Sequence, residues 1–248
     1  MNLTKTGYNL IKKTILIIVI LIVSSFKVAK YDLKSKRVND EEYFSLSLVN
    51  DEYDKIKSHI NKSDNFYKAI GKSESSNRYY VINKYGYCGN YQFSIRNLNL
   101  LGIDTLLLNY SELKSKKRDS ILKSRFLKTP KSQEIAMYRF LKFNNEKLKK
   151  YILKFNNKKI KLSDTAVFVT KTGILAAAHL SGYVNVIKFF ETIEKREEQL
   201  LLNNNDSIPA YSEILKLNKV LLRKNKKDKL GTSIVDYISK ISKYKVFL

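Results

Sequence analysis

The sequence predicts a predominantly helical α+β domain that begins near residue 63, and three observations lead to this prediction. At 248 residues the chain is long enough for one domain of ordinary size with a substantial apolar core. After residue 63, apolar side chains recur mostly with the spacing of an amphipathic helix. Between residues 79 and 93, two short β-prone runs flank the turn-like segment NKYGYC, which indicates one small hairpin.

The first helix of this domain, which spans residues 63–248, is expected to be capped by Ser63 or Asp64 and to end near residue 75. Glu74 then lies at the C-terminal end of that helix. The strongly charged stretch at about 191–228 indicates an insertion. Further helices are expected at residues 95–101, 111–126, 133–155, 172–188, 211–223 and 231–240.

The N-terminus, residues 1–30, has the pattern of a signal peptide or signal anchor. Lysines at positions 5, 12 and 13 precede an unbroken, largely apolar run over residues 14–26. A membrane span needs roughly 20 apolar residues, so this shorter run favours a secretory signal over an ordinary transmembrane helix. We therefore expect export to the periplasm or the extracellular space. Cleavage after Ser25 and retention as a membrane anchor both stay open, and residues 31–62 are expected to form a charged linker and a short helix.

The formal net charge of +24 favours polyanionic partners but does not choose among nucleic acid, anionic lipid and cell-wall polymers. The lysines are scattered along the chain, so a merely soluble basic surface is an equally open interpretation. Export and the lack of a visible recognition helix or stacking platform argue against nucleic acid. Cys88 is the only cysteine, which excludes an intramolecular disulfide, and two histidines offer little for a zinc site. No metal or organic cofactor is expected.

Four short motifs carry the chemistry of the predicted domain. In chain order they are KSESSNRY at residues 72–79, NKYGYCGNYQF at 83–93, GILAAAHLSGY at 173–183 and GTSIVDY at 231–237. Together they resemble the lytic transglycosylase and goose-type lysozyme superfamily, over about Asp64 to Lys240 with the charged insertion between. The resemblance implies a lysozyme-like fold with a small β-hairpin beside the active-site cleft.

The resemblance also implies an activity, cleavage of the β-1,4 bond between N-acetylmuramic acid and N-acetylglucosamine in bacterial peptidoglycan. Glu74 takes the place of the catalytic acid. The sequence departs from the family's pattern at Tyr91, where a leucine–methionine pair is usual, and at His179, where an asparagine is usual. The residues that the resemblance assigns to binding of the glycan strand are Ser75, Gly89, Tyr91, Gln92, His179 and Tyr237.

The proposed acid has a physical requirement, because a carboxyl group that protonates a leaving oxygen must still hold its proton near neutral pH. A helix C-terminus and burial against apolar side chains both favour the neutral form. No second acid occurs between Glu74 and Asp104. This fits the route that the resemblance implies, in which the substrate's N-acetyl group assists and its C6 hydroxyl closes an anhydro ring. Asp164 could fold inward, so hydrolysis stays open.

Each assignment has a purely structural alternative. Glu74 could be a solvated residue at a helix end, Tyr91 and Gln92 ordinary turn residues, and His179 a satisfied core histidine. Tyr237 could simply pack a terminal helix, and Cys88 is expected to be a small buried hydrophobe. A second function is therefore kept open, a cell-wall-binding or assembly protein that has the same fold and no turnover.

Overall fold

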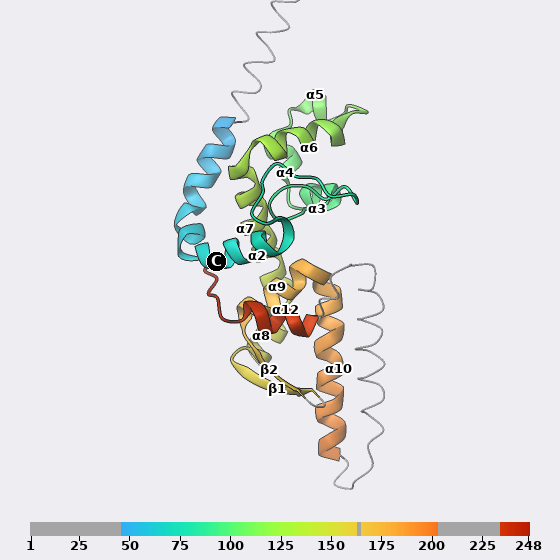
Figure 1. Ribbon diagram of the computed structural model, residues 1–248. Coiled ribbons are helices and arrows are strands. Elements are labelled where there is room, and N and C mark those ends of the chain that lie inside the picture. Colours follow the sequence, from blue (N-terminus) through green and yellow to red (C-terminus); the bar gives the residue numbers. More distant parts are fainter. Residues whose placement is uncertain (1–45, 163–164, 203–233) are drawn as a thin grey trace, which may run out of the picture. The chain divides into compact units, whose positions relative to one another are not determined.

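The computed structural model describes residues 46–162, 165–202 and 234–248 (Figure 1). The expected signal segment, residues 1–30, lies outside the described residues, as do the linker up to residue 45 and the expected helix at 211–223. The chain divides into two units, residues 1–48 and residues 49–248, and the second unit carries all the candidate site residues. No helix among the described residues is both long and apolar enough to cross a membrane.

The second unit is predominantly helical with one small sheet, which confirms the expected α+β class. Residues 49–62 are helical and lead directly into the helix that carries Glu74. The described elements that follow are α2 (Asp64–Ser75), α3 (Ile95–Leu100), α4 (Ile103–Leu107), α5 (Tyr110–Leu113), α6 (Arg118–Lys128), α7 (Pro130–Lys147), α8 (Lys149–Phe155), β1 (Lys158–Leu162), β2 (Thr165–Val169), α9 (Lys171–Ser181), α10 (Tyr183–Leu202) and α12 (Ile234–Ile241).

Three helices expected from periodicity are each broken in two. The stretch 111–126 divides at residues 114–117, between α5 and α6. The stretch 133–155 divides at Leu148, whose φ of −103° and ψ of 8° leave the helical region between α7 and α8. The stretch 172–188 divides at Gly182, whose φ of 80° ends α9. Helix α10 then continues to Leu202, so residues 191–202 of the expected insertion are helical. Periodicity missed the breaks at Leu148 and Gly182 because apolar residues continue at helical spacing across them.

The expected position of the β structure was wrong. Residues 79–93 form only two isolated bridges, Ile82 with Cys88 and Cys88 with Phe93, and no regular hairpin. Backbone turns with positive φ at Gly86, Gly89 and Gln92 interrupt any longer ladder. The regular antiparallel sheet is instead β1 with β2, at residues 158–162 and 165–169. Lysines in β1 obscured its pattern, although in β2 buried Val167 and Val169 flank exposed Phe168 with the period of a strand.

Two apolar cores fill the unit, and α9 and α12 contribute to both. One core gathers α2, the turn at 88–93, α3, α4, α6 and α7, and the other gathers α8, the sheet and α10. In α9, Leu175 and Ala176 belong to the first core, whereas Ala177 and Ala178 belong to the second. Figure 1 shows the two helices side by side, between the α2–α7 region and the sheet. They therefore hold the two cores together.

Glycine at position 173 allows the close approach of α9 and α12. A Cβ atom at this position would overlap Ser242 Oγ and would lie 3.0 Å from the carbonyl oxygen of Ile238. Real Cβ atoms rarely approach backbone oxygens so closely, so the absence of a side chain at Gly173 sets the distance between the helices.

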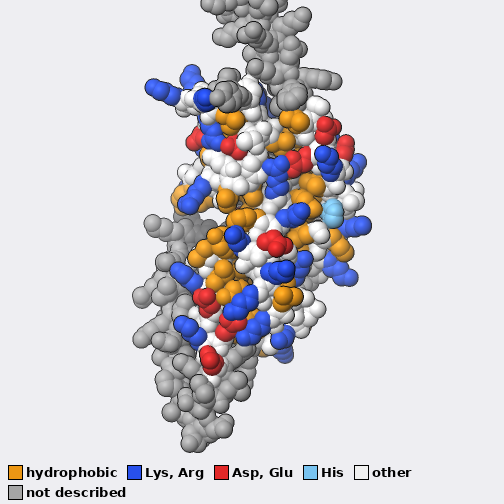
Figure 2. Space-filling model, turned by 180° about the vertical axis from the view of Figure 1, so that it is seen from behind, with side chains coloured by type: hydrophobic (Ala, Val, Ile, Leu, Met, Phe, Trp, Pro, Cys, Tyr) orange, Lys and Arg blue, Asp and Glu red, His pale blue; other side chains and the backbone are white. Residues whose placement is uncertain are grey.

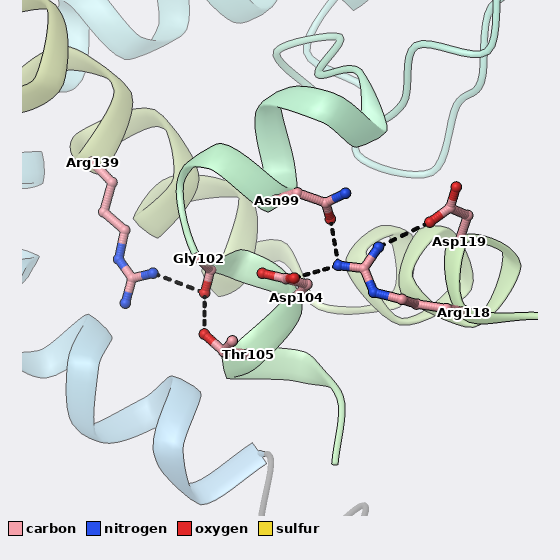
Figure 3. A network of polar contacts seen from close by, with 7 residues as sticks. All are labelled: Asn99, Gly102, Asp104, Thr105, Arg118, Asp119 and Arg139. Atoms are coloured by element: carbon pink, nitrogen blue, oxygen red, sulfur yellow. Dashed lines mark hydrogen bonds and ion pairs between the residues drawn. The ribbon is translucent and has the colours of Figure 1, made fainter. Parts of the chain in front are cut away.

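Arginine side chains tie together the short helices of the first core (Figure 3). The Arg118 guanidinium on α6 donates to Asn99 Oδ1 at 2.9 Å and to the carboxylate of Asp104. Arg139 on α7 donates to the carbonyl oxygens of Leu101 and Gly102, at 2.7 and 3.0 Å. The Arg139 bonds thus reach the carbonyl oxygens of the C-cap residue of α3 and of the N-cap residue of α4.

On the face shown in Figure 2, lysine and arginine side chains are spread among apolar and acidic ones. They do not gather in one patch or stripe on that face. The pattern is therefore that of a generally basic surface, as the scattered lysines of the sequence indicate.

Replacement of Gly173 by alanine tests the helix contact. Alanine favours a helix by up to about 1 kcal/mol, but overpacking at a tight contact costs about 1–3 kcal/mol, so we expect a net loss of unfolding free energy. Urea denaturation measures the change. Ser242→Ala removes the nearest atom and should recover part of the loss in the double variant. A Gly173→Ala protein more stable than the parent would contradict the role assigned to this contact.

Candidate functional site

Glu74 occupies the last turn of α2, as the sequence predicts. The chain leaves the helix at once, because Ser76 and Asn77 both have φ near 60° and the Asn77 N–H donates to the carbonyl oxygen of Gly71 at 3.0 Å. The Glu74 side chain is half-buried, neither enclosed in the core nor fully in solvent. Its carboxyl group is therefore accessible while it is held by a rigid helix end.

Ser75 fastens this helix end to the turn at 88–93. Its buried hydroxyl donates to Asn90 Oδ1 at 3.0 Å and accepts from the Arg78 N–H at 2.9 Å. The Arg78 Nε–H also donates to the Ser75 carbonyl oxygen at 2.8 Å. Since these contacts use the hydroxyl inside the protein, Ser75 positions Glu74 and does not face a ligand.

Tyr237 reaches Glu74 from the other end of the chain. The Tyr237 hydroxyl donates to Glu74 Oε1 at 3.0 Å across 163 positions in sequence. Its ring is buried in α12, with 1% of the residue exposed, so only the hydroxyl is directed at the carboxyl group. The structure thus joins the first and the last of the four motifs at hydrogen-bond distance.

His179, at the end of α9, lies near Glu74 and holds the neighbouring turn. Its Nε2 lies 3.0 Å from the Tyr91 carbonyl oxygen, and the ring packs edge-to-face against Phe93 and Phe140. A carbonyl oxygen only accepts, so Nε2 carries the hydrogen and Nδ1, which is shielded from solvent, has no partner. Burial lowers the pKa of His179, and the negative charge of Glu74 opposes this only in part. The ring is therefore neutral at pH 7.

Gly89 and Gln92 shape the turn that His179 holds. Gly89 has φ of 80°, and a Cβ there would overlap Gln133 Oε1, so only glycine fits. The Gln92 side-chain amide donates to the Gly89 carbonyl oxygen at 2.8 Å and closes the turn on itself. Gln92 is half-exposed and Gly89 is buried. Of these two predicted site residues, only Gln92 presents a side chain toward solvent.

Tyr91 is a core residue and not an open sugar platform. Only 1% of it is exposed, and its ring packs edge-to-face against Tyr67 and Phe93. Its hydroxyl donates to Glu134 on α7, 2.8 Å from Oε2. Tyr91 therefore contacts His179 through its backbone and Glu134 through its side chain.

Glu134 lies beside Tyr91 in this region, and none of the sequence motifs includes it. It is 8% exposed and accepts hydrogen bonds from Tyr91 and from the Tyr79 hydroxyl, the latter at 2.6 Å. Burial raises the pKa of Glu134, and the two phenol donors offset this in part. A signal was present in the sequence, because Glu134 shares the helical stripe of buried Met137 and Leu141 in α7.

Glu134 lies in a pocket of about 450 Å³ that Tyr67, Tyr79, Asn90 and Tyr91 also line. Glu74 is not among the residues that line it. The site region thus holds two carboxyl groups in different surroundings, one half-exposed beside Tyr237 and one buried among tyrosines.

Cys88 is buried beside this turn, and its thiol donates to the Phe93 carbonyl oxygen at 3.3 Å. Burial raises its pKa to about 11, so the thiolate is scarcely populated at neutral pH. Cys88 is a packing residue, as expected. Over residues 46–162, 165–202 and 234–248, no three acidic, histidine or cysteine side chains cluster as a metal site would require.

Comparisons of this chain with protein-family models, with curated proteins and with solved structures give no significant match.

The buried carboxyl group of Glu134 should make the free energy of unfolding depend on pH. Because its pKa is raised on folding, it contributes stability that is complete below the ordinary glutamate pKa and is lost as the pH rises through the folded value. Glu134→Gln should therefore lose less unfolding free energy than the parent between pH 4 and pH 8 in urea denaturation. The same substitution at the exposed position 198, Glu198→Gln, should leave the change in unfolding free energy with pH as it is in the parent. Parallel curves for Glu134→Gln and the parent would refute the assignment.

Proposed function

We propose that this chain is an exported, lysozyme-like enzyme that cleaves the β-1,4 bond between N-acetylmuramic acid and N-acetylglucosamine in peptidoglycan. The hydrogen bond from the Tyr237 hydroxyl to Glu74 is the single observation that carries the proposal. Both residues belong to motifs that resemble the lytic transglycosylase and goose-type lysozyme superfamily, and they meet from opposite ends of the domain. The Tyr237 hydroxyl fixes the orientation of a half-buried carboxyl group at the end of α2, and a positioned catalytic group needs such a fixed orientation.

In this proposal Glu74 protonates the oxygen of the leaving sugar. The Tyr237 hydroxyl donates to Oε1 and so fixes the orientation of the carboxyl group. The Ser75 bonds to Asn90 and Arg78 hold the helix end that carries this group. Fixing the orientation of an acid before the substrate arrives removes part of the entropic barrier to proton transfer.

The neutral state of His179 supports the same role. A positively charged imidazole close to Glu74 would stabilise the carboxylate and oppose protonation. Burial between Phe93 and Phe140 keeps this ring uncharged, while its Nε2–H holds the Tyr91 backbone. His179 is therefore a positioning residue in this mechanism, and it does not exchange a proton with the sugar.

Two routes remain for the oxocarbenium-like species that forms when the bond breaks. In one, the substrate's acetamido group assists, and its C6 hydroxyl attacks C1 and gives its proton to the Glu74 carboxylate, which leaves a 1,6-anhydro end. In the other, water attacks and leaves a reducing end. No acid lies between Glu74 and Asp104, which supports the first route, whereas Asp164 lies outside the described residues. Mass spectrometry of the released fragments separates the two.

The rest of the chain fits a cell-wall enzyme. The lysine-flanked apolar run in residues 1–30 would direct export or anchor the chain. The sequence has a net charge of +24, and lysine and arginine side chains are spread over the face shown in Figure 2. Such a charge would draw the protein to the acidic polymers of a cell wall. No nucleic-acid or cofactor partner is part of the proposal.

A second candidate function is a cell-wall-binding or assembly protein without turnover. One observation favours it: four of the residues that the resemblance assigns to the glycan, Ser75, Gly89, Tyr91 and Tyr237, are buried in the protein. Such a protein would bind peptidoglycan sacculi and release no fragments, whereas the enzyme releases them. A sedimentation assay with analysis of the supernatant distinguishes the two.

Glu74→Gln removes the proton donor and keeps the side-chain shape. We expect turnover of purified peptidoglycan to fall by about 100-fold or more, since general acid catalysis contributes roughly 10²–10⁴. Fragment release measured by chromatography checks this. Glu198→Gln, the same change at an exposed position of α10, should leave turnover unchanged. Equal rates for Glu74→Gln and the parent would exclude Glu74 as the acid.

Tyr237→Phe removes only the hydroxyl that contacts Glu74. A hydrogen bond between neutral groups is worth about 0.5–1.5 kcal/mol, so kcat should fall roughly 2- to 10-fold with little change in KM. A merely structural role would instead lower the melting temperature and leave kcat of the folded fraction intact. Kinetics on a soluble glycan fragment, together with thermal unfolding, separate these outcomes.

A further inference from the structure

The pocket around Glu134 has a chemical character of its own. It has a volume of about 450 Å³, enough for a small organic molecule, and lies where α2 and the N-terminal turn of α7 meet. We call it the tyrosine pocket. The lining residues that matter here are Tyr53, Tyr67, Tyr79, Tyr91, Asn77 and Glu134.

Glu134 has hydrogen-bond partners in this pocket but no counter-ion. The hydroxyls of Tyr79 and Tyr91 donate to its two oxygens, at 2.6 and 2.8 Å. None of the ion pairs formed among the described residues includes Glu134. Each carboxylate oxygen has two lone pairs, so the two phenols leave acceptor capacity unused. A buried carboxylate in this state is stabilised most by a cation.

The hydroxyl of Tyr67 is a second polar group in the pocket with unused hydrogen-bonding capacity. Tyr67 is 4% exposed and lines the pocket, yet its hydroxyl has no hydrogen-bond partner. Leaving a buried hydroxyl without a partner costs roughly 1–3 kcal/mol. Burial and the nearby charge of Glu134 raise the pKa of Tyr67 well above its usual value, so the group is a neutral phenol whose oxygen can accept a hydrogen bond.

The two lysines that line the pocket are engaged elsewhere. Lys68 pairs with Asp64 one helical turn before it, at 2.7 Å, and is largely exposed. Lys131 donates to Asn50 Oδ1 at 2.8 Å and lies 5.2 Å from the centre of the Tyr53 ring. Neither forms an ion pair with Glu134, so the negative interior of the pocket is not neutralised by its own rim.

We infer that the tyrosine pocket binds a ligand through a primary ammonium group. The three N–H donors of an ammonium match the free lone pairs of Glu134 and the unpartnered oxygen of Tyr67. Tyrosine rings add a favourable environment for a cation, because their faces are electron-rich. A neutral sugar could form hydrogen bonds with the hydroxyl and amide groups equally well, but it would leave the negative charge of the Glu134 carboxylate without a counter-charge. The inference does not depend on the proposed cleavage at Glu74.

A pair of ligands with the same ring and different charge tests the inference on the unaltered protein. Isothermal titration calorimetry of the full chain at pH 7.5 compares cyclohexylammonium with cyclohexanol, and N-acetylglucosamine serves as the neutral sugar. We expect cyclohexylammonium to bind at least tenfold more tightly than either neutral ligand. Equal affinities, or tighter binding of N-acetylglucosamine, would overturn the inference.

Variants locate the site. Glu134→Gln should weaken cyclohexylammonium binding at least tenfold and leave cyclohexanol unchanged, whereas Tyr67→Phe should weaken it about threefold. The matched control Glu198→Gln should bind as the parent does. Undiminished binding by a folded Glu134→Gln protein would refute the site. If that variant does not fold, Tyr67→Phe decides, and unchanged binding then counts against the inference. Fragment release from peptidoglycan is assayed separately, so each proposal can fail without the other.

Discussion

The close packing of α9 against α12 is the constraint on which the rest of the domain depends. Gly173 brings the two helices together because any side chain at that position would overlap Ser242. Both helices contribute buried apolar residues to each of the two cores, so each core is completed by the same pair of helices. A shift in their spacing would loosen both cores at once, since protein interiors are close-packed and transmit such displacements.

The same helix pair assembles the candidate site. Helix α12 delivers the Tyr237 hydroxyl to Glu74, and α9 delivers His179 to the backbone of Tyr91. Glu74 itself depends on α2, whose end is held to the turn at 88–93 by Ser75. Four segments distant in sequence thus meet in one region, and the Tyr237 hydroxyl is the group shown to bond the Glu74 carboxyl itself.

Tyr91 separates the two carboxyl environments. Its carbonyl oxygen accepts from His179 on the side of Glu74, and its hydroxyl donates to Glu134 on the side of the pocket. Glu74 is half-exposed, whereas Glu134 is enclosed and its pKa is raised by burial. The same type of side chain therefore has different surroundings at these two positions.

Local pattern determined much of this protein in advance: the helical character, the position of Glu74 at a helix end and the burial of Cys88 all follow from short-range spacing and residue type. Only the tertiary structure decided that Tyr91 is enclosed, that the sheet lies at residues 158–169 and that Glu134 is a buried acid in a pocket. The physical reason is the distance in sequence over which each kind of interaction acts. Periodicity and capping depend on neighbours within a few residues, whereas burial and hydrogen bonding across 163 positions depend on which distant segments pack together.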